Sequence, residues 1–175
     1  MRIKASIFSV CVQVVLIVIY LMVFGQCNRV ENTDSSVGTV GVTLDFSSLP
    51  TGSLPAVFTI DGITGIRIYD QVKRIGDSLW LHEREEFPPG SGNWKDASVM
   101  LLFSQLPCKV SRITTEVHGH GSEARIVGFQ EDGATQTAIC NGGKQVLNLN
   151  TIKENPFTRV ILSGQEAEWI KFHLE

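Results

Sequence analysis

The sequence contains no cluster of lysine and arginine residues. Its 15 basic residues are outnumbered by 18 acidic residues, and the formal net charge is −3. Arg2 and Lys4 lie in the N-terminal segment, so residues 28–175 carry −5. Binding to a phosphate backbone draws its affinity from basic residues that displace counterions. The composition therefore argues against nucleic acid as a partner.

Cysteine is also scarce. Cys11 and Cys27 lie in the N-terminal segment, which leaves only Cys108 and Cys140 in the rest of the chain. In an oxidising compartment these two can form a disulfide that closes a loop of about 30 residues and stabilises the fold by roughly 3–4 kcal/mol. The alternative is a pair of buried thiols, and the sequence leaves both open.

Recognisable catalytic motifs are missing as well, including the Gly-x-Ser-x-Gly elbow and the phosphate-binding loop. Residues 82–86, HEREE, begin like a zinc-protease helix, but Glu86 replaces the second histidine and Pro88 stops a helix. We expect a charged strand end or loop there. Residues 119–124, GHGSEA, have the glycines of a dinucleotide-binding turn, but a strand pattern follows, so we expect a loose hairpin. A non-catalytic role is favoured, and a small polysaccharide-active hydrolase is the lesser alternative, because carboxylates can converge from distant strands.

One long hydrophobic run is present, and it lies at the N-terminus. Arg2 and Lys4 precede residues 7–24, which carry no charge. A basic start followed by an apolar run is typical of an export signal, and the positive-inside rule places residue 28 onward outside the cytoplasm. We therefore expect an extracytoplasmic protein that is either secreted or attached to the cell envelope.

The fate of this leader has three alternatives. Signal peptidase can cleave after Gly25, or the stretch VFGQC, which resembles a bacterial lipobox, can direct acylation of Cys27. The third alternative is an uncleaved membrane anchor, because the run is close to the length of a short membrane span. In each case residues 1–27 form the leader, and the polar residues 28–39 form a flexible tether.

Helical periodicity is absent after the leader, and short alternating runs take its place. Residues 40–46 and 169–174 both alternate apolar and polar side chains, as strands with one buried face do. Many short strands separated by turns imply a β-sandwich or barrel, and we expect the two terminal strands to lie near each other in one sheet of a sandwich. Other β-rich runs cover residues 56–60, 63–69, 78–81, 99–103, 109–117, 125–129, 135–140, 145–149 and 159–162.

The last run carries the most definite expectation, because its alternation is unbroken. The side chains predicted to enter the core are Ile170, Phe172 and Leu174. Those predicted to face outward are Trp169, Lys171 and His173.

Two stretches carry a resemblance to a known family. LDFSSLPTG, residues 44–52, looks like the start of many galactose-binding-like jelly-roll domains of exported bacterial proteins, and FTRVILSG followed by EWIKF, within residues 157–172, resembles their end. The resemblance covers residues 40–175 and implies an all-β, jelly-roll-type antiparallel sandwich. Domains of this type commonly bind carbohydrate as accessory modules, often beside a structural calcium ion. Asp45 and Glu168 are the acidic residues nearest to where the resembled family places calcium ligands, which prefer oxygen donors.

Four further residues are candidate ligand-binding groups. Trp94 and Asn93 lie in a polar, glycine-rich stretch, where the indole can stack on a sugar ring and the amide can hydrogen-bond to it. The indole can equally fold back over the sandwich edge. His118 and His120 flank a glycine and could hold a metal, but two histidines are too few without a third ligand. The sequence thus predicts a binding module with a glycan as the favoured ligand, and a structural or adhesion domain that binds another surface protein as the alternative.

Overall fold

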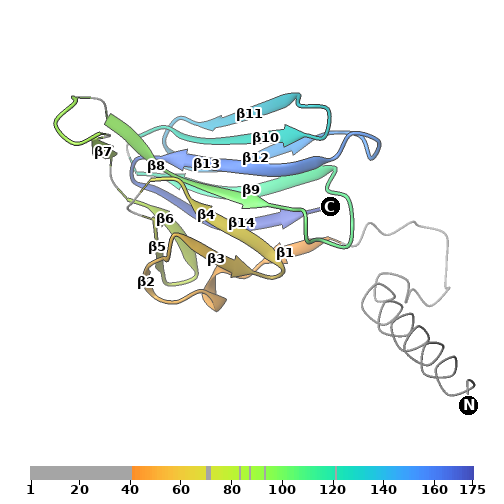
Figure 1. Ribbon diagram of the computed structural model, residues 1–175, viewed down its shortest axis with the longest axis horizontal. Coiled ribbons are helices and arrows are strands. Elements are labelled where there is room, and N and C mark those ends of the chain that lie inside the picture. Colours follow the sequence, from red (N-terminus) through yellow and green to blue (C-terminus); the bar gives the residue numbers. More distant parts are fainter. Residues whose placement is uncertain (1–40, 70–71, 83, 87, 93, 121) are drawn as a thin grey trace, which may run out of the picture. The chain divides into compact units, whose positions relative to one another are not determined.

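The computed structural model describes residues 41–69, 72–82, 84–86, 88–92, 94–120 and 122–175. In this part of the chain two antiparallel sheets pack face to face (Figure 1). Sheet A contains β1 (Val42–Leu44), β2 (Gly52–Ser53), β5 (Val72–Ile75), β6 (Ser78–Leu81), β9 (Arg112–Gly119), β12 (Gly143–Asn150) and β14 (Ala167–Leu174). Sheet B contains β3 (Val57–Ile60), β4 (Ile63–Arg67), β7 (Arg84–Glu86), β8 (Trp94–Leu102), β10 (Ala124–Gln130), β11 (Thr135–Cys140) and β13 (Phe157–Gly164).

Eight of these strands pair in a nested order. β6 pairs with β14, β8 with β13, β9 with β12, and β10 with β11. The first of the eight therefore lies beside the last, the second beside the seventh, and so on inward, which is the pairing of a long hairpin rolled into a two-layered sandwich. The resulting orders, β12-β9-β14-β6 and β11-β10-β13-β8, are those of a jelly roll. The predicted fold class is confirmed by this topology.

Turn-forming residues account for two of the hairpins. Asp61 and Gly62 connect β3 and β4 with φ angles of 47° and 80°, as a two-residue type I′ turn requires. The stretch from Glu131 to Gly133 connects β10 and β11, where the Gly133 N–H donates to the Gln130 carbonyl at 3.1 Å. The glycine-containing link at residues 120–123 is different from expectation: it joins β9 in sheet A to β10 in sheet B, so it is a crossover between layers and not a hairpin.

The two terminal strands lie side by side, as predicted. Leu44 of β1 pairs with Phe172 of β14, and both side chains are buried. The predicted alternation of β14 is wrong in its first half, because the register shifts between Trp169 and Lys171. This β-bulge adds one residue to β14, so the alternation of inward and outward side chains shifts by one position. Trp169 is consequently buried in the core with 0% exposure, and Ile170 is only half-buried.

The predicted disulfide is not formed. Cys108 lies in the segment before β9, whereas Cys140 ends β11, pairs with Ala124 and lies close to Gly119 at the far end of β9. The length of β9, roughly 25 Å for eight residues, separates the two ends. A disulfide needs Cα atoms within about 7 Å, so both residues keep their thiols.

The predicted leader, the tether and Cys27 lie outside the described residues, as does Asn93. Among the described residues, no helix has the length and apolar character needed to span a membrane.

Candidate functional site

The outer face of sheet A carries a continuous row of side chains that runs across its strands. Residues directly opposite each other in antiparallel strands share one face of the sheet. Glu168 of β14 is opposite both His118 of β9 and Trp80 of β6. Lys144 of β12 extends the row on one side, and Lys73 of β5 extends it on the other. Because strands lie about 4.8 Å apart, these five residues span roughly 20 Å.

Aromatic rings are stacked at the centre of this row. His120 lies just after β9, on the same side of the strand as His118, because side chains two residues apart share a face. The His120 ring stacks on Trp80 with centroids 4.9 Å apart and an interplanar angle of 19°. The His118 and His120 centroids are 3.8 Å apart. The three rings therefore form one contiguous aromatic surface that is partly exposed to solvent.

Gly119 allows the two histidines to take this position. It faces inward, and a Cβ atom added there would lie 2.6 Å from the Ser122 carbonyl oxygen. The chain turns tightly here into the crossover to sheet B, and the His120 N–H donates to the Glu166 carbonyl at 2.9 Å. No larger residue fits between the histidines without moving this turn.

Glu168 connects the rings to the sheet beneath them. Its Oε2 lies 3.4 Å from His120 Nε2 and 3.9 Å from His118 Nδ1. Its Oε1 accepts a hydrogen bond of 2.8 Å from the hydroxyl of Ser78, a buried residue of β6. One ligand atom each from His118, His120 and Glu168 can lie within 4.8 Å of the others, a spacing at which the three could hold a metal ion.

Neighbouring charges are paired away from this cluster. Lys144 is opposite His118, but its Nζ forms an ion pair and a hydrogen bond with Glu116. That hydrogen bond holds the pKa of the Glu116 carboxyl below its usual range. His82 Nδ1 lies 3.2 Å from Glu166 Oε1. The Glu168 carboxylate therefore has the two histidines and Ser78 as its neighbours, and the lysine beside it is engaged elsewhere.

The structure separates the two predicted calcium ligands. Asp45 Oδ1 accepts hydrogen bonds from the Ser47 N–H and hydroxyl, and so caps the short helix η2 (Phe46–Ser48). Asp45 directly follows Leu44, which is opposite Phe172, so it lies about three residues, or roughly 10 Å, along the sheet from Glu168. Glu168 is grouped with two imidazoles instead of with a second acid.

Trp94 begins β8 opposite Glu86 of β7, so this residue is in a strand and not in the loop that was predicted. Two residues later, Asp96 lines a hollow of about 240 Å³ together with Ser122 and Gln165. In the sequence, Ser122 comes shortly after His120, and Gln165 comes shortly before Glu168. The start of β8 thus lies at the same end of the sandwich as His118 and His120, on the other layer.

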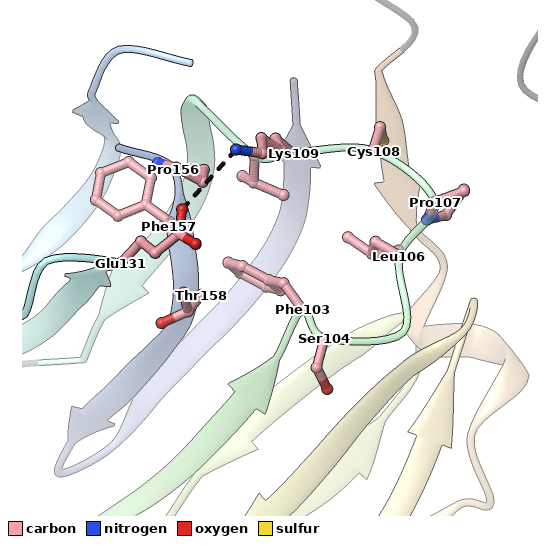
Figure 2. Close-up of a pocket in the computed structure, with 11 residues that line it drawn as sticks. Phe103, Ser104, Leu106, Pro107, Cys108, Lys109, Glu131, Pro156, Phe157 and Thr158 are labelled. Atoms are coloured by element: carbon pink, nitrogen blue, oxygen red, sulfur yellow. Dashed lines mark ion pairs between the residues drawn. The ribbon is translucent and has the colours of Figure 1, made fainter. Parts of the chain in front are cut away.

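A second hollow, of about 290 Å³, lies at the opposite end of the sandwich (Figure 2). Its lining is mainly apolar and comes from the segment between β8 and β9 and from the start of β13. An ion pair of 3.9 Å between Lys109 and Glu131 crosses its rim. The apolar residues around it are Phe103, Leu106, Pro107, Val110, Pro156 and Phe157.

Sequence reasoning found both histidines and Glu168 but assigned them to different sites, and it missed Trp80 and Ser78. The signal for Trp80 was present: the run SLWL places Leu79 and Leu81 inward, and so turns the indole to the outer face. Nothing in the sequence shows that β6 and β9 both lie next to β14, because that neighbourhood follows from the nested pairing.

No protein-family model and no curated protein matches the sequence. Solved structures with a similar backbone include a family 29 carbohydrate-binding module from Piromyces equi, at 12% identity and a TM-score of 0.48, over 78% of this chain and 93% of that one. A mutant of another family 29 module has 12% identity and a TM-score of 0.49, over 78% of this chain and 87% of that one. A family two carbohydrate esterase from Cellvibrio japonicus has 12% identity and a TM-score of 0.41; the match covers 77% of this chain and 33% of the esterase.

Proposed function

We propose that residues 40–175 form a non-catalytic carbohydrate-binding module whose ligand lies on the outer face of sheet A. The observation that carries this proposal is the aromatic surface formed by Trp80, His118 and His120 beside the Glu168 carboxylate. A sugar ring has apolar C–H faces that pack on aromatic rings and hydroxyl groups that hydrogen-bond to carboxylates and amines. Both kinds of group occur here within one row across the sheet.

The shape of the row favours an extended ligand. Lys73 and Lys144 lie at either side of the aromatic surface, and register places Ser53 of β2 beyond Lys73 on the same face. Hydrogen-bonding groups thus continue outward from the rings in both directions. A chain of several sugar units lying across the strands would contact all of them, whereas a single sugar would contact only the centre.

Export belongs to the same proposal. Arg2, Lys4 and the uncharged residues 7–24 support a leader that carries residue 28 onward out of the cytoplasm. Acylation of Cys27, or retention of the leader, would attach the module to a membrane. A glycan-binding module in this location would meet polysaccharides of the cell surface or the surroundings.

The proposal is tested by glycan-array binding followed by titration of the best polysaccharide. Trp80→Ala should weaken binding by about tenfold or more, equivalent to about 1.4 kcal/mol. His173→Ala is the matched control, because His173 is on the same face and strand as Glu168 but hydrogen-bonds to Thr43 at 2.8 Å, away from the rings.

Three results would contradict this assignment. Equal binding by the wild type and Trp80→Ala would place the ligand elsewhere. A loss with Trp94→Ala alone would move it to the start of β8. Absence of glycan binding, together with capture of one surface protein, would support an adhesion domain instead.

A further inference from the structure

We propose that His118, His120 and Glu168 bind a divalent transition-metal ion, with Zn²⁺ as the best-suited ion. The inference is independent of whether a glycan binds on this face. Two imidazoles and one carboxylate are donors typical of zinc, whereas calcium takes six to eight oxygen ligands. Grouping Glu168 with histidines, and not with Asp45, therefore changes the class of metal from the one that the sequence suggested.

The distances between the donor atoms suit a tetrahedral ion. Zinc binds histidine nitrogen and carboxylate oxygen at about 2.0–2.2 Å, so two ligand atoms of a tetrahedral site lie about 3.4 Å apart. Glu168 Oε2 is 3.4 Å from His120 Nε2 and 3.9 Å from His118 Nδ1. All three donor atoms lie within 4.8 Å of one another, so an ion is accommodated when side-chain movements close these distances by up to about 1.4 Å.

The groups behind the donors hold them in position. The Ser78 hydroxyl binds Oε1 of Glu168, which leaves Oε2 directed at the two imidazoles. Trp80 packs flat against His120 and limits rotation of its ring. Partners of this kind, which orient the ligands without touching the metal, commonly contribute 10- to 100-fold in metal affinity.

Solvent access supplies the fourth position of the site. The side chains of His118, His120 and Glu168 are 37%, 35% and 21% exposed, so the cluster opens outward from the sheet. The neighbouring Lys144 is held by Glu116 and does not compete for the Glu168 carboxylate. A fourth ligand, water or an oxygen of a bound molecule, can therefore complete the coordination.

The test is isothermal titration calorimetry of the purified full-length chain with ZnCl₂ and, separately, with CaCl₂. We expect saturable binding of one Zn²⁺ per chain that EDTA reverses, and no comparable binding of Ca²⁺. His120→Ala and Glu168→Gln should each lower the zinc affinity at least about tenfold. Cobalt substitution gives a second readout, because tetrahedral Co²⁺ absorbs strongly in the visible range and both variants should lose that absorption.

His173→Ala is the matched control. His173 Nε2 lies 3.3 Å from Glu175 Oε1 on the same face, and within the described part of the chain no third His, Cys, Asp or Glu joins this pair in a metal-binding group, so this variant should keep the wild-type zinc affinity. Glu168→Gln is nearly isosteric and retains an oxygen for Ser78, and His120→Gln replaces the alanine variant should that one unfold. Absence of zinc binding by the wild type, or unchanged affinity in cooperatively folded Glu168→Gln and His120→Gln, would overturn the proposal.

Discussion

Glu168 uses the two oxygens of one carboxylate for different partners. The Ser78 hydroxyl donates to Oε1, and the two histidines face Oε2. A free carboxylate rotates about its last torsion, whereas this one has a single orientation that satisfies both sets of contacts. At the residue scale, the site is therefore organised by a serine from the neighbouring strand, which no pattern in the sequence marks as functional.

Asp45 gives a pH-dependent prediction at the same scale. The hydrogen bond from the Ser47 hydroxyl, followed by that from the Ser47 N–H, lowers the pKa of Asp45 below its ordinary value of 3.8. Because the folded-state pKa is the lower one, the stabilisation is present above the unfolded value and is lost as pH falls through the folded value. Asp45→Asn should therefore lower the urea midpoint at pH 7, and this decrease should become progressively smaller below about pH 4.

Urea unfolding of the wild type and Asp45→Asn between pH 7 and pH 3 measures this difference. Ser47→Ala is the companion variant, because it removes the main cause of the lowered pKa while leaving the carboxyl in place. Its effect on the midpoint should follow the same pH dependence. A difference between wild type and Asp45→Asn that stays constant down to pH 3 would contradict the assignment.

At the scale of the element, β14 combines core and site in one strand. Ala167, Trp169, Phe172 and Leu174 are buried, while Glu168 faces outward. The bulge after Trp169 is what allows this, because an unbroken alternation would put either the indole or Phe172 on the solvent side. The bulge that results lies directly beside Glu168 and the histidine cluster.

Phe172→Ala and Lys171→Ala test this strand. Phe172 is fully buried, so its truncation should cost about 3–5 kcal/mol through lost burial and a cavity. Lys171 is exposed, and its truncation should cost less than about 1 kcal/mol. The free energies of unfolding in urea provide the comparison. Equal, small effects would mean that the C-terminal strand does not enter the core.

The strands could be predicted from the sequence where alternation and turn residues agreed, as in β6 and β11, whose bounds match the expected runs. β2 and β5 were missed because β2 has two residues and β5 has only Val72 fully buried. The bulge in β14 was missed because alternation continues in the sequence on both sides of it. The histidine pair was visible as His-x-His, but its third member lies 48 residues after His120 and is brought there by strand order alone.

At the scale of the whole molecule, the two ends of the sandwich differ in character. The end with His118 and His120 is polar, aromatic and charged, whereas the end with Phe103 and Phe157 carries the mainly apolar hollow of Figure 2. The proposed leader would hold the module at a membrane, and the surface around His118 and His120 would then have to remain accessible to a ligand. The proposed location of residues 28–175 outside the cytoplasm is a property of the entire chain, because the signal for it lies in residues 1–27.

A reporter fused after Glu175 tests that location. An enzyme that is active only outside the cytoplasm should be active in this fusion, because Arg2 and Lys4 retain the N-terminus inside. Deleting residues 1–27 should abolish the reporter's activity and serves as the control. Activity of a cytoplasm-only reporter at the same position would show that the chain is not exported.

The nested strand pairing has a consequence for how the protein is made. β14 is the final strand, yet it lies between β9 and β6 and also pairs with β1, so sheet A stays open until Leu174 has left the ribosome. Contacts of such long sequence separation close slowly. During synthesis sheet A therefore cannot be completed before β14 has emerged, and β6 and β9 lack their shared neighbour until then. An unfolded chain is the form that passes through a membrane during export. Late completion of sheet A is therefore compatible with the proposed export.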